Sequence, residues 1–163
     1  MKDFQSPPNG LRRLGPGARA LYGLYLLFTA LGLCSAALLH YDGLGLDAET
    51  ATSWFRGNEA DAYPKSFRQL AELTHFHLFT EPVALLVVSH LYALGTDSGG
   101  RRALAIGGTA AAIVLQIGLP WVVTYVTPAA GVLFLPVHAA LFVGFGYMIL
   151  RGAVDLWAAG REA

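Results

Sequence analysis

Residues 73–95 read LTHFHLFTEPVALLVVSHLYALG, a stretch in which Glu81 is the only carboxylate or cationic amine. At about 1.5 Å of rise per residue, a helix of this length crosses the roughly 30 Å hydrocarbon core of a bilayer. Backbone groups in lipid must pair within their own segment, so this run predicts a transmembrane helix. Three similar runs lie at about 20–39, 103–126 and 130–150. The sequence therefore predicts an all-α bundle of four transmembrane helices that run up-down-up-down.

The composition agrees with a single membrane domain over residues 1–163. The chain is 55% hydrophobic and 13% charged, with a mean hydropathy of +0.49. A soluble domain of this size needs more polar surface, so the excess apolar area is expected to face the lipid bilayer. The net charge of zero argues against a nucleic-acid partner. Cys34 is the only cysteine, which excludes an intramolecular disulfide.

The connections differ in length and charge. We expect a leader over residues 1–19, an outer loop over 40–72, and short turns after the second and third spans. The outer loop is expected to be mainly a solvated connector. A short amphipathic piece on the membrane surface, involving Trp54-Phe55 and the stretch 63–70, is the alternative.

Lysine and arginine set the expected orientation. Eight of the eleven lie in the leader, the second loop and the tail, and three lie in or near the outer loop. Short loops rich in Lys and Arg stay on the cytoplasmic side. Both termini are therefore predicted to be cytoplasmic, in a membrane of the bacterial inner-membrane type.

All five histidines lie in or at the ends of the apolar spans. They are His40, His75, His77, His90 and His138. Ionisable side chains inside a membrane are costly and usually functional. Counting residues from the span ends places His77 and His138 at a common depth, roughly 9–12 Å below the outer surface.

Two further polar residues are expected near mid-membrane. Glu81 lies one turn below His77 on the same helix face, and Gln116 of the third span counts back to nearly the same depth. A carboxylate at this depth must be protonated or paired. Its natural partners are His77 and Gln116.

Histidines from different helices at one depth favour a haem b site. Two imidazoles on facing helices can ligate the iron axially, here His77 and His138, with Gly131 on the face of His138 making room. His75 or His40 would replace one of these ligands or form a hydrogen bond with a haem propionate. His90, with Met148 opposite it, is the candidate for a second, inner haem.

Two alternatives use the same residues. A divalent metal, Zn or Cu, would take His75, His77 and His138, with Glu81 or His40 completing the set. Alternatively, the polar side chains only hold helices together, as in a non-catalytic accessory or assembly subunit of a membrane complex or in a homo-oligomer.

Two resemblances bear on these alternatives. The run Pro64-Lys65-Ser66-Phe67, followed by Glu72, Thr74-His75-Phe76-His77, Pro82 and Ser89-His90, resembles a group of small bacterial inner-membrane proteins without an assigned activity. The four spans with deep histidines resemble cytochrome b-type electron-transfer subunits. This second resemblance implies electron transfer between a quinone pool and an outer-face partner, within an oxidoreductase complex.

Overall fold

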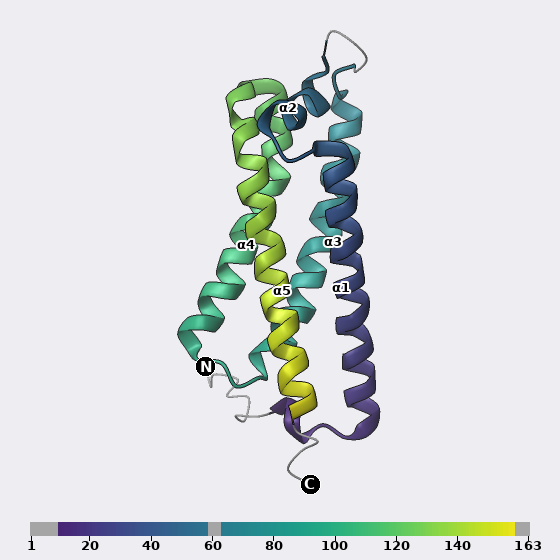
Figure 1. Cartoon of the computed structure of the whole chain (residues 1–163), viewed down its shortest axis with the longest axis vertical. Coiled ribbons are helices and arrows are strands. Elements are labelled where there is room, and N and C mark those ends of the chain that lie inside the picture. Colours follow the sequence, from purple (N-terminus) through teal and green to yellow (C-terminus); the bar gives the residue numbers. More distant parts are fainter. Residues whose placement is uncertain (1–9, 59–62, 159–163) are drawn as a thin grey trace.

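A computed structural model describes residues 10–58 and 63–158, and within these ranges every regular element is a helix. Four long helices run side by side in an elongated bundle (Figure 1). They are α1 (Pro16–Leu44), α3 (Phe67–Ala93), α4 (Gly99–Trp121) and α5 (Phe134–Ala158). The short elements are the 3₁₀ turns η1 (Gly10–Arg13) and η3 (Pro128–Leu133), the helix α2 (Ala48–Arg56) and the π-helical turn η2 (Val122–Val126).

The four predicted spans are confirmed. Each of the four long helical segments is long and apolar enough to cross a membrane, with η2 extending α4 and η3 preceding α5. The helix α1 extends beyond the predicted run at both ends, where local sequence signals mark its start and its end. Pro16 stands at the first position of α1, where its fixed φ suits a helix start. Gly45 ends α1 with a φ of +65°, a conformation that glycine adopts without steric cost.

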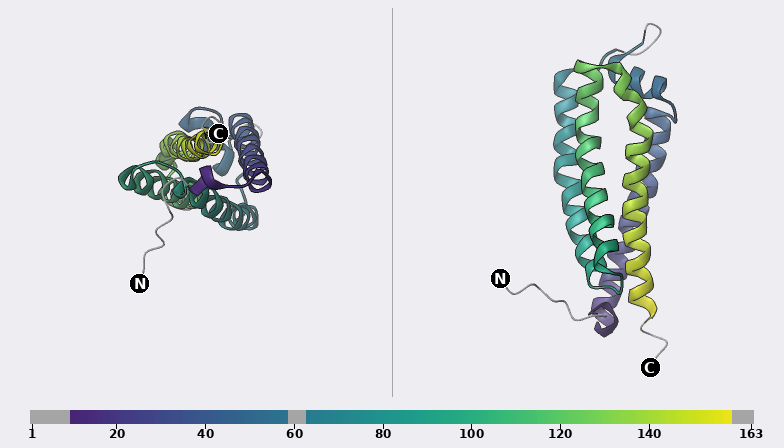
Figure 2. Two further views of the ribbon diagram at one scale, coloured as in Figure 1. Left: turned by 90° about the horizontal axis from the view of Figure 1, so that it is seen from below. Right: turned by 90° about the vertical axis from the view of Figure 1, so that its left-hand side faces the viewer.

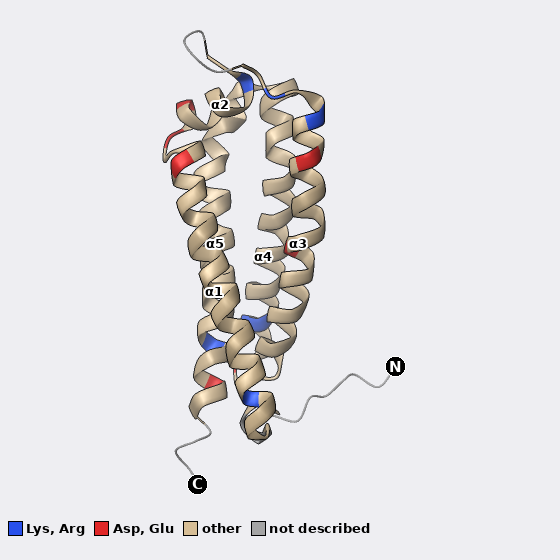
Figure 3. Cartoon of the chain, turned by 90° about the vertical axis from the view of Figure 1, so that its right-hand side faces the viewer, with Lys and Arg blue, Asp and Glu red and all other residues tan. Residues whose placement is uncertain are grey.

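Consecutive long helices alternate in direction (Figure 2). The turn η1 packs against α5, so the described start and end of the chain lie at one end of the bundle, here named the terminal end. The opposite end carries α2 and is named the α2 end. Charged residues gather mainly at these two ends (Figure 3). The membrane side that each end faces remains a prediction from the Lys and Arg distribution.

The expected outer loop is largely helical. Residues 40–44 complete α1, residues 67–72 begin α3, and α2 lies between them. Asp47 caps α2 by accepting a hydrogen bond from the Thr50 amide at 2.8 Å. Phe55 of α2 is only 2% exposed and stacks on Phe134, with ring centroids 5.1 Å apart. Instead of an open connector, this segment folds back and covers the α2 end of the bundle.

Helix packing is uneven around the bundle. The helices α3, α4 and α5 pack closely against one another. Helix α1 packs along α5 and against α2, and its backbone comes close to that of α3 at few positions. Near the terminal end, Leu26 of α1 fits against Gly152 of α5. Toward the α2 end, the space between α1 and its neighbours is not filled by these contacts, and the candidate site lies there.

Candidate functional site: a cavity lined by histidines

A cavity of about 820 Å³ lies among α1, α3, α4 and α5. Trp54 and Phe55 of α2 contribute to its lining at the α2 end. Its walls are mainly apolar, and its volume falls in the range of small-molecule and cofactor sites, about 300–1,000 Å³. Figure 3 shows α1 and α5 on one side of the bundle and α3 and α4 on the other.

Three polar side chains meet in the cavity wall between α3 and α4. The Oε1 atom of Glu81 lies 2.7 Å from Nδ1 of His77, one turn earlier on α3. The same Oε1 atom accepts a hydrogen bond from Nε2 of Gln116 on α4, also at 2.7 Å. The structure therefore brings together the three residues that depth counting predicted as partners. Their bonds tie the middle of α3 to α4.

His138 lies on the α5 wall and is buried. Its Nδ1–H donates to the carbonyl oxygen of Phe134, one turn earlier, at 2.8 Å. The ring of His40, from α1, lies against the His138 ring with centroids 4.1 Å apart. His40, His77 and His138 therefore line one cavity from three different helices.

The hydrogen bonds fix which nitrogen of each ring is available. A carbonyl oxygen only accepts, so His138 carries its proton on Nδ1. With Glu81 ionised, its carboxylate accepts from His77, which places the His77 proton on Nδ1. Both imidazoles are thus left with a lone pair on Nε2. A metal-ligating histidine usually shows this arrangement, in which a carboxylate or a backbone carbonyl holds the other nitrogen.

The remaining predicted residues lie elsewhere. His75 and His90 face outward from α3 and do not line the cavity. Gly131 is buried against α2, where a side chain would collide with Thr52 and approach the Ala48 carbonyl oxygen to 3.0 Å. Because Gly131 has no side chain, α2 can pack directly against it. Met148 is fully buried in the apolar core, and outward-facing His90 is not brought to it.

The alternative metal site gains no support from this arrangement. Within residues 10–58 and 63–158, no group of three or more His, Cys, Asp or Glu side chains is placed to hold a metal ion. The exposed position of His75 explains why the proposed trio does not assemble. Residues two apart on a helix point about 200° apart around its axis, so His75 and His77 cannot share one face.

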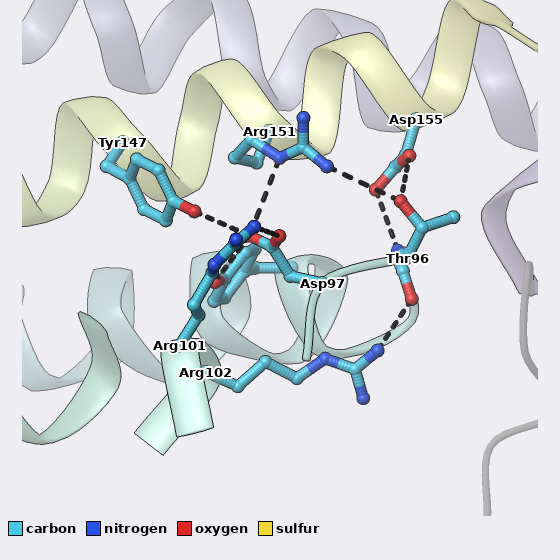
Figure 4. A network of polar contacts seen from close by, with 9 residues as sticks. Thr96, Asp97, Arg101, Arg102, Tyr147, Arg151 and Asp155 are labelled. Carbon is cyan, nitrogen blue, oxygen red and sulfur yellow. Dashed lines mark hydrogen bonds and ion pairs between the residues drawn. The ribbon is translucent and has the colours of Figure 1, made fainter. Parts of the chain in front are cut away.

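A second polar cluster, at the terminal end, was not predicted. The buried carboxylate of Asp97, in the turn between α3 and α4, accepts hydrogen bonds from the hydroxyls of Tyr147 at 2.7 Å and Tyr92 at 2.9 Å. Arg101 and Arg151 lie 3.4 and 3.5 Å from its oxygens. Figure 4 shows Tyr147, Arg101 and Arg151 converging on Asp97.

The same turn is held by a second carboxylate. Asp155 of α5 accepts hydrogen bonds from the backbone amide and the hydroxyl of Thr96, both at 2.9 Å (Figure 4). Arg102 donates to the Gly95 carbonyl oxygen at 2.8 Å. The only sequence signal was a cluster of charges at one loop, which by itself predicts orientation and not pairing. The cluster holds the terminal end together, and none of its residues lines the cavity.

Comparison with known proteins gives one match. A family model described as a transmembrane helical domain matches residues 45–163, a segment that contains His77, Glu81, Gln116 and His138 and leaves out α1. No curated protein and no solved structure matches the chain. The resemblance to cytochrome b-type subunits is therefore not shown by these comparisons.

Proposed function

The chain belongs to this family of transmembrane helical domains, and we propose that it is a membrane electron-transfer subunit that binds haem b in the cavity. His77 of α3 and His138 of α5 would be the axial ligands. Electrons would pass between a quinone pool and a partner on the outer face, which we assign to the α2 end. We further propose the bacterial-type inner membrane as its location.

One observation carries the proposal. His77 and His138 line the same cavity from different helices, and each ring has Nδ1 engaged by an acceptor that leaves Nε2 available. Imidazole ligands of haem iron need this arrangement, because the second nitrogen must be held for the ring to keep its orientation.

The surrounding residues fit an apolar cofactor with two axial ligands. Phe134, Leu141 and Phe145 of α5 supply apolar walls and exclude water. Glu81 would orient the His77 ring as a ligand, and the Phe134 carbonyl would do the same for His138. Bound haem b would supply one-electron redox chemistry. No Cys-x-x-Cys-His motif is present in the sequence, so attachment would be non-covalent.

A non-catalytic accessory or assembly subunit is the second candidate. The observation that favours it is the bond between Gln116 and Glu81, which joins α4 to α3 without any ligand. Interhelical hydrogen bonds of this kind contribute on average about 0.6 kcal/mol in membranes. In this reading the polar residues stabilise the bundle and the cavity is filled by lipid.

The absorption spectrum of protein purified in mild detergent from haem-sufficient cells tests the proposal. We expect a Soret band and a sharp reduced-minus-oxidised α band, both lost in His77→Ala and in His138→Ala. His75→Ala and His90→Ala are matched controls, because these histidines lie on the same helix as His77 but face outward. Colourless protein would contradict haem binding and support the accessory role.

A further inference from the structure

The two ends of the bundle expose opposite charge. Among the side chains that the structure describes, the terminal end carries four cations and two anions, namely Arg19, Arg101, Arg102, Arg151, Asp97 and Asp155. Both of these carboxylates are buried, so the charge that reaches the surface there is positive. Within the same described residues, the α2 end carries four exposed carboxylates beside three cations, the carboxylates being Asp42, Asp47, Glu49 and Glu72. The terminal end is therefore the end that favours an anionic partner.

Two arginines at the terminal end share one buried carboxylate. Nη1 of Arg101 lies 3.4 Å from Oδ1 of Asp97, and Nε of Arg151 lies 3.5 Å from Oδ2 of the same group (Figure 4). A single carboxylate balances only one of the two cations. The side chain of Asp97 is 3% exposed, whereas those of Arg101 and Arg151 are 70% and 32% exposed. The unbalanced charge therefore lies at the surface, on guanidinium groups that Asp97 already holds in place.

These guanidinium groups lie where phospholipid head groups are expected. Arg101 is in the first turn of α4, just before the apolar run that begins at residue 103, and Arg151 directly follows the run that ends at residue 150. Head groups lie just outside the hydrocarbon core that such runs cross. A guanidinium group presents its donors in a planar fork that suits phosphate oxygens. Arg101 bonds Asp97 from Nη1 only, and it has no other hydrogen-bond partner among the described residues.

From Arg101 toward the α2 end, α4 exposes an apolar face on which an acyl chain can lie. Leu104, Gly108, Ala111 and Leu115 recur at intervals of three and four on the side of α4 that carries Arg101, and all four are exposed. A side chain added at Gly108 would meet no protein atom within 4 Å, so no neighbouring helix covers this position. An acyl chain against these residues would run from a head group at Arg101 into the membrane.

We propose that the terminal end binds an anionic phospholipid. Its phosphate group accepts hydrogen bonds from Arg101 and Arg151, and one of its acyl chains lies along α4 against Leu104 and Gly108. A zwitterionic phospholipid gains less, because its ammonium group is repelled by the same arginines. Inorganic phosphate lacks the acyl chain and gains only the contacts of the head group. None of these four residues lines the cavity, so the inference does not depend on haem binding there.

Retention of lipid by the purified protein measures this preference. The full chain is equilibrated in mixed micelles with equal amounts of phosphatidylglycerol and phosphatidylcholine that carry the same acyl chains. It is then repurified, and the lipids that stay bound are quantified by mass spectrometry. We expect phosphatidylglycerol to be retained about fivefold or more over phosphatidylcholine, because each arginine near a membrane surface favours anionic lipid by about this factor. The preference should weaken as the salt concentration rises.

Three variants and a control locate the effect. Arg101→Gln should reduce the phosphatidylglycerol-to-phosphatidylcholine ratio by about fivefold, whereas Arg101→Lys keeps the charge and should retain most of the preference. Gly108→Phe should reduce the amount of phosphatidylglycerol retained, because the new ring occupies the place of the acyl chain without meeting another protein atom at its Cβ. Arg68→Gln is the matched control, since Arg68 is an exposed arginine at the α2 end that pairs with Glu72.

Equal retention of the two lipids by the natural chain would overturn the proposal, as would equal losses in Arg101→Gln and Arg68→Gln. Displacement of the retained lipid by inorganic phosphate would show that the head group alone is recognised, and the acyl-chain contact would then be wrong. A dimer in mixed micelles that is lost in Gly108→Phe would assign this face of α4 to a second copy of the chain and would contradict a lipid there. All of these results are read from lipid content or oligomeric state, so they are distinct from the presence or absence of a Soret band.

Discussion

The imidazole rings of His40 and His138 lie against each other, with centroids 4.1 Å apart and planes inclined by 37°. His40 comes from the end of α1, and His138 comes from the first turns of α5. The Nδ1 atom of His138 is already bonded to the Phe134 carbonyl oxygen. The His40 ring therefore covers a face of His138 and supports its position from the side.

This contact makes His40 a neighbour of the proposed ligand pair, and we do not include His40 in that pair. We expect His40→Ala to retain most of the haem α band, because His77 and His138 keep their own acceptors. The band should be recovered more completely in His40→Phe, which restores a ring against His138. Optical spectra of both variants, normalised to protein concentration, measure how much of the α band each variant retains. Loss of the band in both variants would show that His40 is itself a ligand.

Glu81 offers a test of what its bonds contribute. In Glu81→Gln the remaining Oε1 atom can still accept from His77 and Gln116, so we expect the protein to accumulate and stay folded. Glu81→Leu leaves both donors without an acceptor and should destabilise the bundle by about 1–3 kcal/mol. Thermal unfolding in detergent, monitored by size-exclusion chromatography, compares the stability of the two variants. If the Gln form fails to accumulate, an ionised carboxylate is required for the fold.

Depth in the membrane was predictable from the sequence, whereas rotation about each helix was not. The rise per residue is fixed, so counting from the span ends places His77, Glu81, Gln116 and His138 near one level. The structure places these four around one cavity. The directions in which His75 and His90 point depend on how α3 packs against α4 and α5, and α3 carries apolar residues all round.

Tertiary contacts account for what the sequence did not predict. Phe55 is buried because residues far along the chain pack against it, among them Phe134, whose ring stacks on it. Asp97 meets Tyr147 and Arg151 only when the α3–α4 turn reaches α5. Neither pairing leaves a local pattern, so the folding back of α2 and the cluster at the terminal end emerge only from the assembled bundle.

Orientation in the membrane is a separate prediction. Eight of the eleven Lys and Arg residues fall within residues 1–19, at the start of α4 and within residues 151–163, which predicts a cytoplasmic terminal end. A reporter fused at the C-terminus or inserted near Asp97 should read as cytoplasmic. One inserted near Glu59, which lies outside the described residues, should read as extracytoplasmic. The opposite pattern would place the cavity near the cytoplasmic surface and reverse the assignment of the α2 end.

The Asp97 cluster predicts a pH dependence of stability. The Tyr147 hydroxyl, supported by Tyr92 and by the Arg151 and Arg101 cations, holds the pKa of Asp97 below its ordinary value, although burial opposes this. A carboxyl group whose pKa is lower in the folded state stabilises the fold at every pH above its unfolded value of about 3.9. That contribution is lost as the pH falls through the lower, folded-state value.

Asp97→Asn removes this charge and keeps the shape of the side chain. At pH 7 the variant should be less stable than the natural chain by about 1–3 kcal/mol, because charge-assisted hydrogen bonds from Tyr147 and Tyr92 are weakened. The difference should shrink as the pH falls below about 3.9, because the carboxyl group of the unfolded chain then takes up a proton. Thermal unfolding in detergent across this range measures it, with Asp42→Asn as the control at an exposed carboxylate. A difference between Asp97→Asn and the natural chain that stays constant down to pH 3 would show that packing, and not the ionised carboxylate, holds the terminal end together.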